Sequence, residues 1–155
     1  MNTTNEVAPV EDCMSFWHLN ICGLDRHHHQ LEMEVETHQP DIIGLTETHH
    51  VEEPRELNYY TFIGSKAPST SKSGTGFYIK NFRGRSERVH IPFQDPVTEG
   101  RITAHIFNNM YLIEAYAPCQ GKRIDDFYEY LNSHATDAET RGLPLLIMGD
   151  FNGHI

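Results

Sequence analysis

The feature that most constrains the fold is a set of short apolar segments that each end at a polar residue. Residues 14–20 read MSFWHLN, residues 41–47 read DIIGLTE, and residues 144–150 read PLLIMGD. Apolar runs of this length are typical of strands that are buried within a sheet. Patterns of helical period lie between such segments, at residues 25–38 and 125–139. Strands and helices mixed in this way predict a layered α/β domain.

The middle of the chain predicts further strands. Three of them are expected at residues 59–64, 76–80 and, more weakly, 87–93. Residues 101–107 and 110–117 are expected to form a hairpin. The reason is the Asn108-Asn109 pair between them, because asparagine tolerates the positive φ that a tight turn requires.

Composition and charge exclude several classes of protein. The 155 residues are 38% hydrophobic and 22% charged, which predicts one globular domain over residues 13–155 after a flexible leader at residues 1–12. No apolar run is long enough to span a membrane, and the acidic N-terminus does not resemble a secretory signal. We therefore expect a nuclear or cytoplasmic protein with reduced cysteines. The net charge of −10 argues against a broad basic face for nucleic acid, but not against an enzyme that brings a divalent cation to a phosphate.

Polar side chains follow four of the predicted strands. They are Asn20, Glu47, Tyr116 and Asp150, with Asn152 two residues further on. Any one polar residue at a strand end is usually only solvated. In layered α/β proteins, however, strand ends and their loops converge on functional sites, so the joint pattern predicts such a site.

Five motifs in order resemble the endonuclease/exonuclease/phosphatase family. They are HLNICGL (18–24), PDIIGLTETH (40–49), SGTGFYIK (73–80), YAPC (116–119) and LIMGDFN (146–152). Their order and spacing are most similar to the apurinic-endonuclease-like nuclease domain of LINE-type (non-LTR) retrotransposons. The resemblance implies the N-terminal half of a four-layered α/β sandwich. It also implies metal-dependent phosphodiester hydrolysis, in the form of a DNA endonuclease that nicks its target.

The resemblance assigns a role to each polar residue at the strand ends. Glu47 would be the main ligand of a Mg²⁺ or Mn²⁺ ion, and Asn20 would complete the surroundings of that metal directly or through water. Tyr116 would donate its hydroxyl to the scissile phosphate. Asp150 would orient and deprotonate the attacking water, which Asn152 would help to position.

Several basic residues and histidines have two interpretations. Lys72, Lys122 and Arg123 are candidate contacts to the nucleic-acid backbone, or are basic residues on solvated loops. His49 lies two residues beyond Glu47 and could approach the metal or a phosphate, but we interpret it as a solvated loop residue. The histidines at 27–29 are consecutive on a predicted helix, where side chains diverge by about 100° each, so they are not expected to chelate one ion.

The sequence also departs from the family pattern. Cys22 and Cys119 stand where the family often has asparagine, and we interpret both as small, reduced and partly buried. Family members continue past GDFN to a Ser-Asp-His motif, a tripeptide that this sequence does not contain. We therefore expect an incomplete domain whose C-terminal half, with most of the second sheet, is missing. Such a chain is expected to be inactive alone, because one acid–base group contributes about 10²–10⁴ in rate.

Three functions remain open at this point. The first is the DNA endonuclease described above. The second keeps the family but changes the substrate, giving a phosphatase or an RNA exonuclease. The third is a degenerate, non-catalytic remnant. The expected partners are DNA and, in the parent protein, the missing C-terminal half or a reverse transcriptase domain, with no membrane contact.

Overall fold

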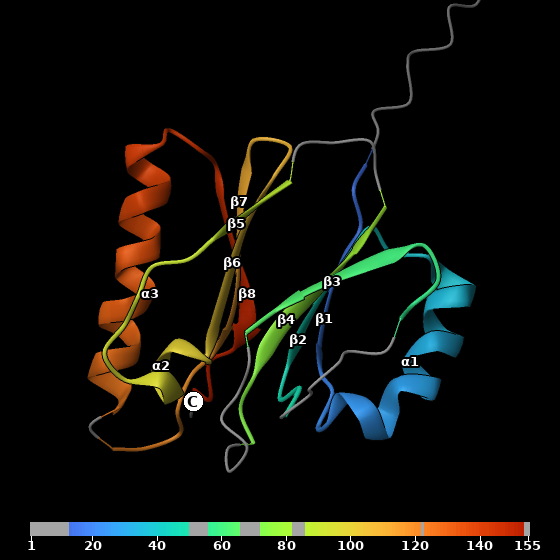
Figure 1. Ribbon diagram of the computed structural model, residues 1–155, viewed down its shortest axis with the longest axis horizontal. Helices are drawn as coiled ribbons and strands as arrows, with labels where there is room; N and C mark the ends of the chain where they lie inside the picture. Colours follow the sequence, from blue (N-terminus) through green and yellow to red (C-terminus); the bar gives the residue numbers. More distant parts are fainter. Residues whose placement is uncertain (1–12, 50–55, 66–71, 82–85, 122, 154–155) are drawn as a thin grey trace, which may run out of the picture.

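Two four-stranded sheets pack face to face, and a long helix covers the outer face of each (Figure 1). The computed structural model describes residues 13–49, 56–65, 72–81, 86–121 and 123–153. The predicted leader at residues 1–12 lies outside the described residues, and so does Lys122. The described part therefore has a mixed α/β fold, as predicted.

The first sheet has the strand order β1-β2-β4-β3. Its strands are β1 (Phe16–Asn20), β2 (Ile42–Thr46), β3 (Tyr60–Gly64) and β4 (Thr75–Lys80). β1 and β2 are parallel neighbours, and the helix α1 (Leu24–His38) connects them. The other two pairings, of β4 with β2 and with β3, are antiparallel.

The second sheet has the strand order β5-β6-β7-β8. Its strands are β5 (Ser86–Val89), β6 (Ile102–Phe107), β7 (Met110–Tyr116) and β8 (Leu145–Asp150). β7 and β8 are parallel, and the helix α3 (Arg123–Thr140) connects them. The predicted hairpin joins β6 to β7, and both turn residues have positive φ, 46° at Asn108 and 65° at Asn109. The hairpin prediction is therefore confirmed.

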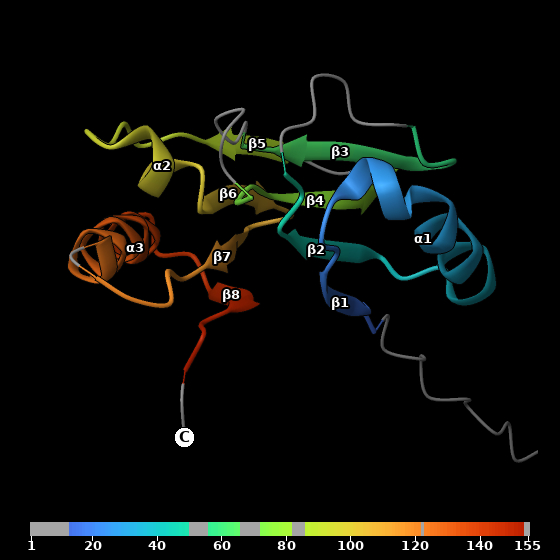
Figure 2. The same ribbon diagram turned by 90° about the horizontal axis from the view of Figure 1, so that it is seen from below.

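Three apolar clusters separate the four layers, which Figure 2 shows from below. Leu24, Leu31 and Val35 recur at helical spacing and bury one face of α1 against the first sheet. Ile42, Phe77 and Leu112 belong to the cluster between the two sheets. The third cluster lies between the second sheet and α3, where Phe127 and Tyr130 of the helix are buried. Each helix is thus fixed to its sheet by an amphipathic face.

Several details differ from expectation. The chain itself supplies a four-stranded second sheet, so the expectation that most of the second sheet is missing is wrong. A short helix, α2 (Pro96–Glu99), was not predicted, although Asp95 caps it through the backbone N–H of Val97 and Pro96 occupies its first position. His28 is only 5% exposed, because it faces the first sheet with the apolar side of α1. None of the described helices combines the length and the apolar character that a membrane span requires.

Candidate functional site

The two parallel strand pairs deliver the predicted polar residues to one edge of the molecule. Asn20 ends β1, and Glu47 directly follows β2, which is the parallel neighbour of β1. Tyr116 and Asp150 end β7 and β8 and are partners in the register of the second sheet. β1 and β8 are the outer strands of their sheets and contact each other. The ends of the two parallel strand pairs therefore lie together, on the side of the molecule where the C-terminus is marked in Figure 1.

A hydrogen-bond network joins these four residues across the two sheets. The amide Nδ2 of Asn20 donates to Glu47 Oε1 at 2.9 Å and to Asp150 Oδ2 at 3.5 Å. The hydroxyl of Tyr116 donates to the same Glu47 oxygen at 2.8 Å. Two carboxylates therefore converge on one amide donor, which offsets part of their mutual repulsion.

Tyr116 is held as a neutral hydrogen-bond donor. Burial, followed by the hydrogen bond to Glu47, raises the pKa of Tyr116 to about 12. The guanidinium of Arg101 lies 4.9 Å from the centre of the tyrosine ring and donates to the backbone carbonyl of Tyr116 at 3.1 Å. No sequence signal marked Arg101, which directly precedes β6 and holds both the tyrosine ring and the end of β7.

Asn152 supports the site through the backbone. Its N–H donates to Asp150 Oδ1 at 2.9 Å, and its side-chain Nδ2 donates to the carbonyl of Ala117 at 2.6 Å. Its φ of 46° places it in the left-handed region, which asparagine tolerates better than most residues. Asn152 therefore orients the Asp150 carboxylate and ties the end of β8 to the end of β7.

A buried acidic residue beside the site escaped the sequence interpretation. Glu114 on β7 is fully buried, and its Oε1 lies 2.7 Å from Nδ1 of His18 on β1. This hydrogen bond, together with the charges of Glu114 and Asp150, raises the pKa of His18. His18 lines a hollow of about 500 Å³ with Asp150 and Asn152. A carboxylate inside the apolar run MYLIEAYA was the available signal.

The predicted nucleic-acid contacts are less concentrated. Arg123 begins α3 and pairs with Asp95, with Nε 3.4 Å from Oδ2. Lys72 is exposed on the segment that leads into β4, and Lys122 lies outside the described residues. Neither Lys72 nor Arg123 joins the network of the strand-end residues in the part of the chain that the structure describes.

The donor set at this edge fits a divalent cation. Glu47 and Asp150 offer carboxylate oxygens, which hard cations prefer. Asn20, in contrast, turns its nitrogen toward both carboxylates, while its Oδ1 accepts from the backbone N–H of Cys22 at 3.2 Å. In this arrangement Asn20 holds the carboxylates together and does not present a free oxygen to a metal.

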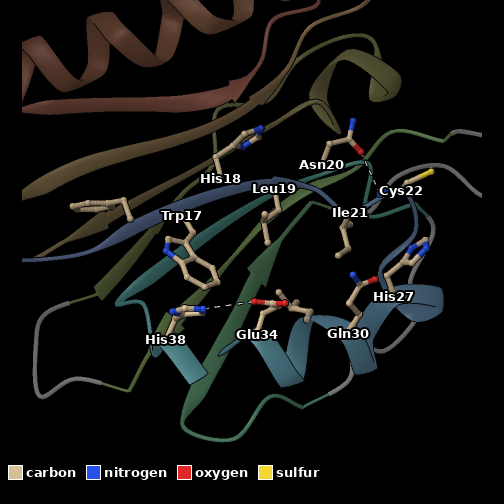
Figure 3. Close-up of a pocket in the computed structure, with 12 residues that line it drawn as sticks. Trp17, His18, Leu19, Asn20, Ile21, Cys22, His27, Gln30, Glu34 and His38 are labelled. Atoms are coloured by element: carbon tan, nitrogen blue, oxygen red, sulfur yellow. Dashed lines mark hydrogen bonds and ion pairs between the residues drawn. The ribbon is translucent and has the colours of Figure 1, made fainter. Parts of the chain in front are cut away.

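A groove of about 790 Å³ with one largely apolar wall and one polar wall lies between β1 and α1 (Figure 3). Trp17, Leu19 and Ile21 of the β1 segment form one wall, and α1 forms the other. One end of the groove reaches Asn20 and Cys22, but the paired carboxylates lie outside it. Cys22 and Cys119 are both free and exposed, so the expectation that they are partly buried is wrong.

Solved structures with a similar fold come from several organisms. A 3'-5' exonuclease from Neisseria meningitidis superposes with a TM-score of 0.71 at 18% identity, covering 90% of this chain and 57% of that one. A Neisseria 3' phosphatase bound to product DNA hairpin gives a TM-score of 0.67 at 20% identity, with coverage of 90% and 57%. The Xenopus laevis APE2 catalytic domain gives 0.66 at 18% identity, with coverage of 90% and 58%. These likenesses show the shared fold.

The chain spans less than three fifths of the length of these structures. A sequence profile gives the more direct assignment. The profile of the Endonuclease/Exonuclease/phosphatase family matches residues 18–154, which is most of the chain. The matched range includes every strand-end residue described above. The chain therefore belongs to the endonuclease/exonuclease/phosphatase family.

Proposed function

We propose that this chain carries part of the active site of a metal-dependent DNA endonuclease that nicks phosphodiester bonds. The observation that supports this proposal best is the network of Asn20, Glu47, Tyr116 and Asp150, which gathers two carboxylates and a neutral phenol from both sheets. A DNA substrate is also supported by the similar Neisseria structure that was solved with a product DNA hairpin.

Each residue of the network is proposed to have a distinct role in hydrolysis. Asp150, oriented by the N–H of Asn152, accepts the proton of the attacking water. Tyr116 remains protonated near neutral pH and donates its hydroxyl to a phosphate oxygen, where charge develops. Lys72, Lys122 and Arg123 are proposed contacts to the nucleic-acid backbone. Arg123 has to leave Asp95 to serve in this way.

A Mg²⁺ or Mn²⁺ ion is the proposed cofactor. Glu47 is its main proposed protein ligand, and Asn20 assists by turning its amide or through water. When bound, such a cation supplies positive charge that offsets the charge of the phosphate. The overall charge of −10 makes this contribution more necessary, because the chain offers little basic surface of its own.

These 155 residues alone are proposed to act at a rate near background. They contain no Ser-Asp-His motif, and one preorganised donor to developing charge is worth about 10²–10³ in rate. The similarity of the TETH, YAP and LIMGDFN motifs supports a LINE-type retrotransposon context. In that context the partners would be a C-terminal half of the nuclease domain and a reverse transcriptase domain.

A nicking assay on supercoiled plasmid tests the proposal. Protein in excess over plasmid, with Mg²⁺ present, is expected to relax the plasmid slowly. Glu47→Gln and Asp150→Asn should abolish this relaxation, and both keep the size of the side chain. Nicking that persists in both variants would remove the site assignment.

The same assay separates the alternatives when other substrates are added. Release of phosphate from a 3'-phosphorylated DNA end, without nicking, would favour a phosphatase, which is what one similar Neisseria structure is named. Degradation of RNA alone would favour an RNA exonuclease. Binding of DNA without turnover of any substrate would favour a non-catalytic remnant.

A further inference from the structure

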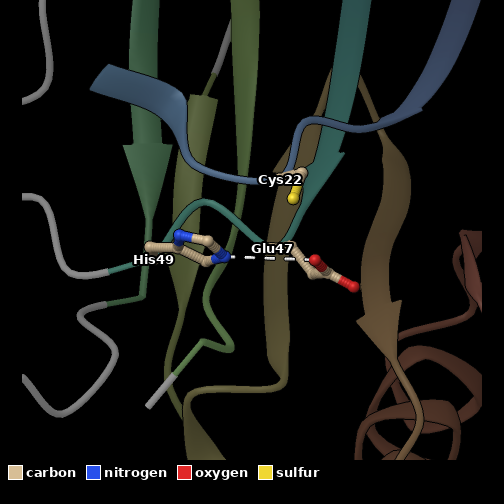
Figure 4. A group of neighbouring side chains, drawn as sticks. All are labelled: Cys22, Glu47 and His49. Carbon is tan, nitrogen blue, oxygen red and sulfur yellow. Dashed lines mark ion pairs between the residues drawn. The ribbon is translucent and has the colours of Figure 1, made fainter. Parts of the chain in front are cut away.

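A second group of candidate metal ligands lies beside the network of Asn20, Glu47, Tyr116 and Asp150. Cys22, Glu47 and His49 each offer one ligand atom, and these atoms all lie within 4.8 Å of one another (Figure 4). They come from the segments that follow β1 and β2, which are parallel neighbours and so end at the same edge. Figure 4 shows a nitrogen of His49 directed at the carboxylate of Glu47, with the sulfur of Cys22 nearby.

The two segments are fixed to each other by their backbones. The N–H of Gly23 donates to the carbonyl of Glu47 at 2.7 Å, which joins the two segments, and the N–H of His49 donates at 2.9 Å to the carbonyl of Ser73 on the segment before β4. Cys22, Glu47 and His49 all have positive φ, at 49°, 52° and 61°. Side chains with a Cβ adopt this conformation at an energetic cost, and such residues gather at functional sites. Local structure thus holds these three side chains in place.

The polar atoms of the cluster include one that lacks a partner. Nε2 of His49 is shielded from solvent and makes no hydrogen bond within the described part of the chain. It lies 3.9 Å from Oε2 of Glu47, whereas Oε1 of the same carboxylate accepts from Asn20 and Tyr116. Glu47 therefore directs one oxygen to Asn20 and Tyr116 and the other to His49 and Cys22. A buried nitrogen without a partner calls for an explanation, and a bound cation supplies one.

We propose that Cys22, Glu47 and His49 form a Zn²⁺ site that shares Glu47 with the proposed Mg²⁺ site. One sulfur, one nitrogen and one oxygen suit a borderline cation such as Zn²⁺, which takes three protein ligands and leaves a fourth position for water. Mg²⁺ prefers oxygen donors and six ligands, so it does not suit this set. The inference deepens the proposed function, since it assigns a metal to the same edge, but the binding itself does not depend on hydrolysis.

The cluster needs only a small adjustment to bind. Zinc bonds of about 2.0–2.3 Å place tetrahedral ligand atoms roughly 3.3–3.8 Å apart, so the largest separation has to shorten by about 1 Å. Cys22 is exposed, so its side chain can rotate without disturbing the core. The sulfur moves toward Glu47 and His49, and the 3.9 Å between Nε2 of His49 and Oε2 of Glu47 shortens by roughly 0.5 Å.

Titration with Zn²⁺ and with Co²⁺, a spectroscopic probe of zinc sites, tests the proposal on the full 155-residue chain without DNA. The chain should bind one Zn²⁺, and Co²⁺ should produce a thiolate-to-metal absorption band together with the visible bands of a tetrahedral site. Cys22→Ser should abolish the thiolate band. Cys119→Ser is the matched control, because Cys119 is also an exposed free cysteine and lies outside the cluster.

The affinity of the variants supplies a second measurement. His49→Gln is expected to weaken Zn²⁺ binding at least about 100-fold, since changes that only perturb the support of a ligand already cost about 10–100-fold. Circular dichroism of each variant checks that the fold is retained. A thiolate band that persists in Cys22→Ser, or that disappears in Cys119→Ser, would overturn the site. Displacement of Zn²⁺ by an equal concentration of Mg²⁺ would do the same.

The two proposals fail separately. Zinc binding that requires Cys22 and His49, found together with nicking that persists in Glu47→Gln and Asp150→Asn, keeps this inference and removes the proposed function. Nicking with Mg²⁺ that is unchanged in Cys22→Ser, found without zinc binding, does the reverse.

Discussion

His18 on β1 and Glu114 on β7 form a polar pair that connects the two sheets, with 2.7 Å between Nδ1 and Oε1. Glu114 is fully buried, and the neighbouring cluster between the sheets is apolar. The pair therefore fixes the edge of one sheet relative to the other directly beside Asp150, which lines the same hollow as His18. Its ionisation state links the stability of the sandwich to pH.

The first prediction concerns this pair at neutral and alkaline pH. The hydrogen bond to Glu114 raises the pKa of His18 above its ordinary value of 6.5, and burial raises the pKa of Glu114. Both shifts make the folded state hold protons more tightly than the unfolded state. The contribution of this pair to the free energy of unfolding should therefore be complete below about pH 6.5 and be lost as the pH rises through the raised pKa of His18. Urea unfolding between pH 6 and 9 measures this slope.

Glu114→Gln should reduce the slope and lower the free energy of unfolding at pH 6 by about 1.5–3 kcal/mol, the usual contribution of a hydrogen bond to a charged group. The matched control is Glu99→Gln, which removes the carboxylate of an exposed pair with His90. That surface pair is expected to contribute at most about 1 kcal/mol. An unchanged slope in Glu114→Gln would show that His18 and Glu114 do not titrate as a pair.

Replacing Gly44 by any larger residue is predicted to lower the stability of the fold, because the carboxylate of Glu114 lies against it. A Cβ at position 44 would collide with Oε2 of Glu114. It would also lie 2.7 Å from Cδ of Glu114 and 3.3 Å from Cε of Met148. Gly44→Ala should therefore lower the free energy of unfolding by about 1–3 kcal/mol, as other overpacked cores do. Thermal unfolding followed by circular dichroism gives the measurement.

Gly153→Ala is the control for that substitution, since a Cβ there meets no atom within 4 Å. A Glu114→Ala background removes the colliding carboxylate, so Gly44→Ala should cost less in it than in the wild type. Equal costs in the two backgrounds would mean that Glu114 is not the obstacle.

A buried histidine predicts a loss of stability in acid. His134 on α3 is 1% exposed, and its Nδ1 lies 3.0 Å from the hydroxyl of Tyr111. Burial lowers the pKa of His134 to about 4. Because the unfolded state binds the proton more readily, the free energy of unfolding should fall as the pH drops from about 6.5 toward 4, by about 2–4 kcal/mol. His134→Gln should flatten this part of the profile, whereas His29→Gln, at a histidine whose side chain is 83% exposed, should not. An acid slope that survives in His134→Gln would assign it to other groups.

The strands and helices could be predicted from the sequence because their signals are local. The apolar run at residues 41–47 corresponds to β2 (Ile42–Thr46), and the helical period at residues 25–38 corresponds to α1 (Leu24–His38). The convergence of Asn20 and Asp150 needed more than local pattern. It was predicted from the joint pattern of polar residues at strand ends in a layered α/β protein, and the family resemblance then assigned a role to each of them.

The remaining features depend on contacts between distant segments. His18 and Glu114 are 96 residues apart in sequence, and only the packing of one sheet on the other brings them together. The orientation of the Asn20 amide is likewise decided by the two carboxylates beside it. The exposure of Cys22 depends on a left-handed backbone after β1, which a cysteine in a motif does not reveal.

The last prediction uses the amide of Asn20 as a probe of the cation site. Asn20 donates to Glu47 and to Asp150, so Asn20→Asp replaces a shared donor by a third carboxylate. In the presence of EDTA, the free energy of unfolding should fall by about 0.5–1.5 kcal/mol, because the hydrogen bonds are lost and like charges meet. Saturating Mg²⁺ should restore more stability to Asn20→Asp than to the wild type, since a cation that binds only the folded state stabilises it more when its affinity is higher.

Asn20→Ala, which removes the donor without adding charge, is the control. It should show the loss of stability in EDTA but no enhanced response to Mg²⁺. Thermal unfolding of the three proteins, each with EDTA and with Mg²⁺, measures both effects. An equal response to Mg²⁺ in Asn20→Asp and Asn20→Ala would place the cation away from this cluster of carboxylates.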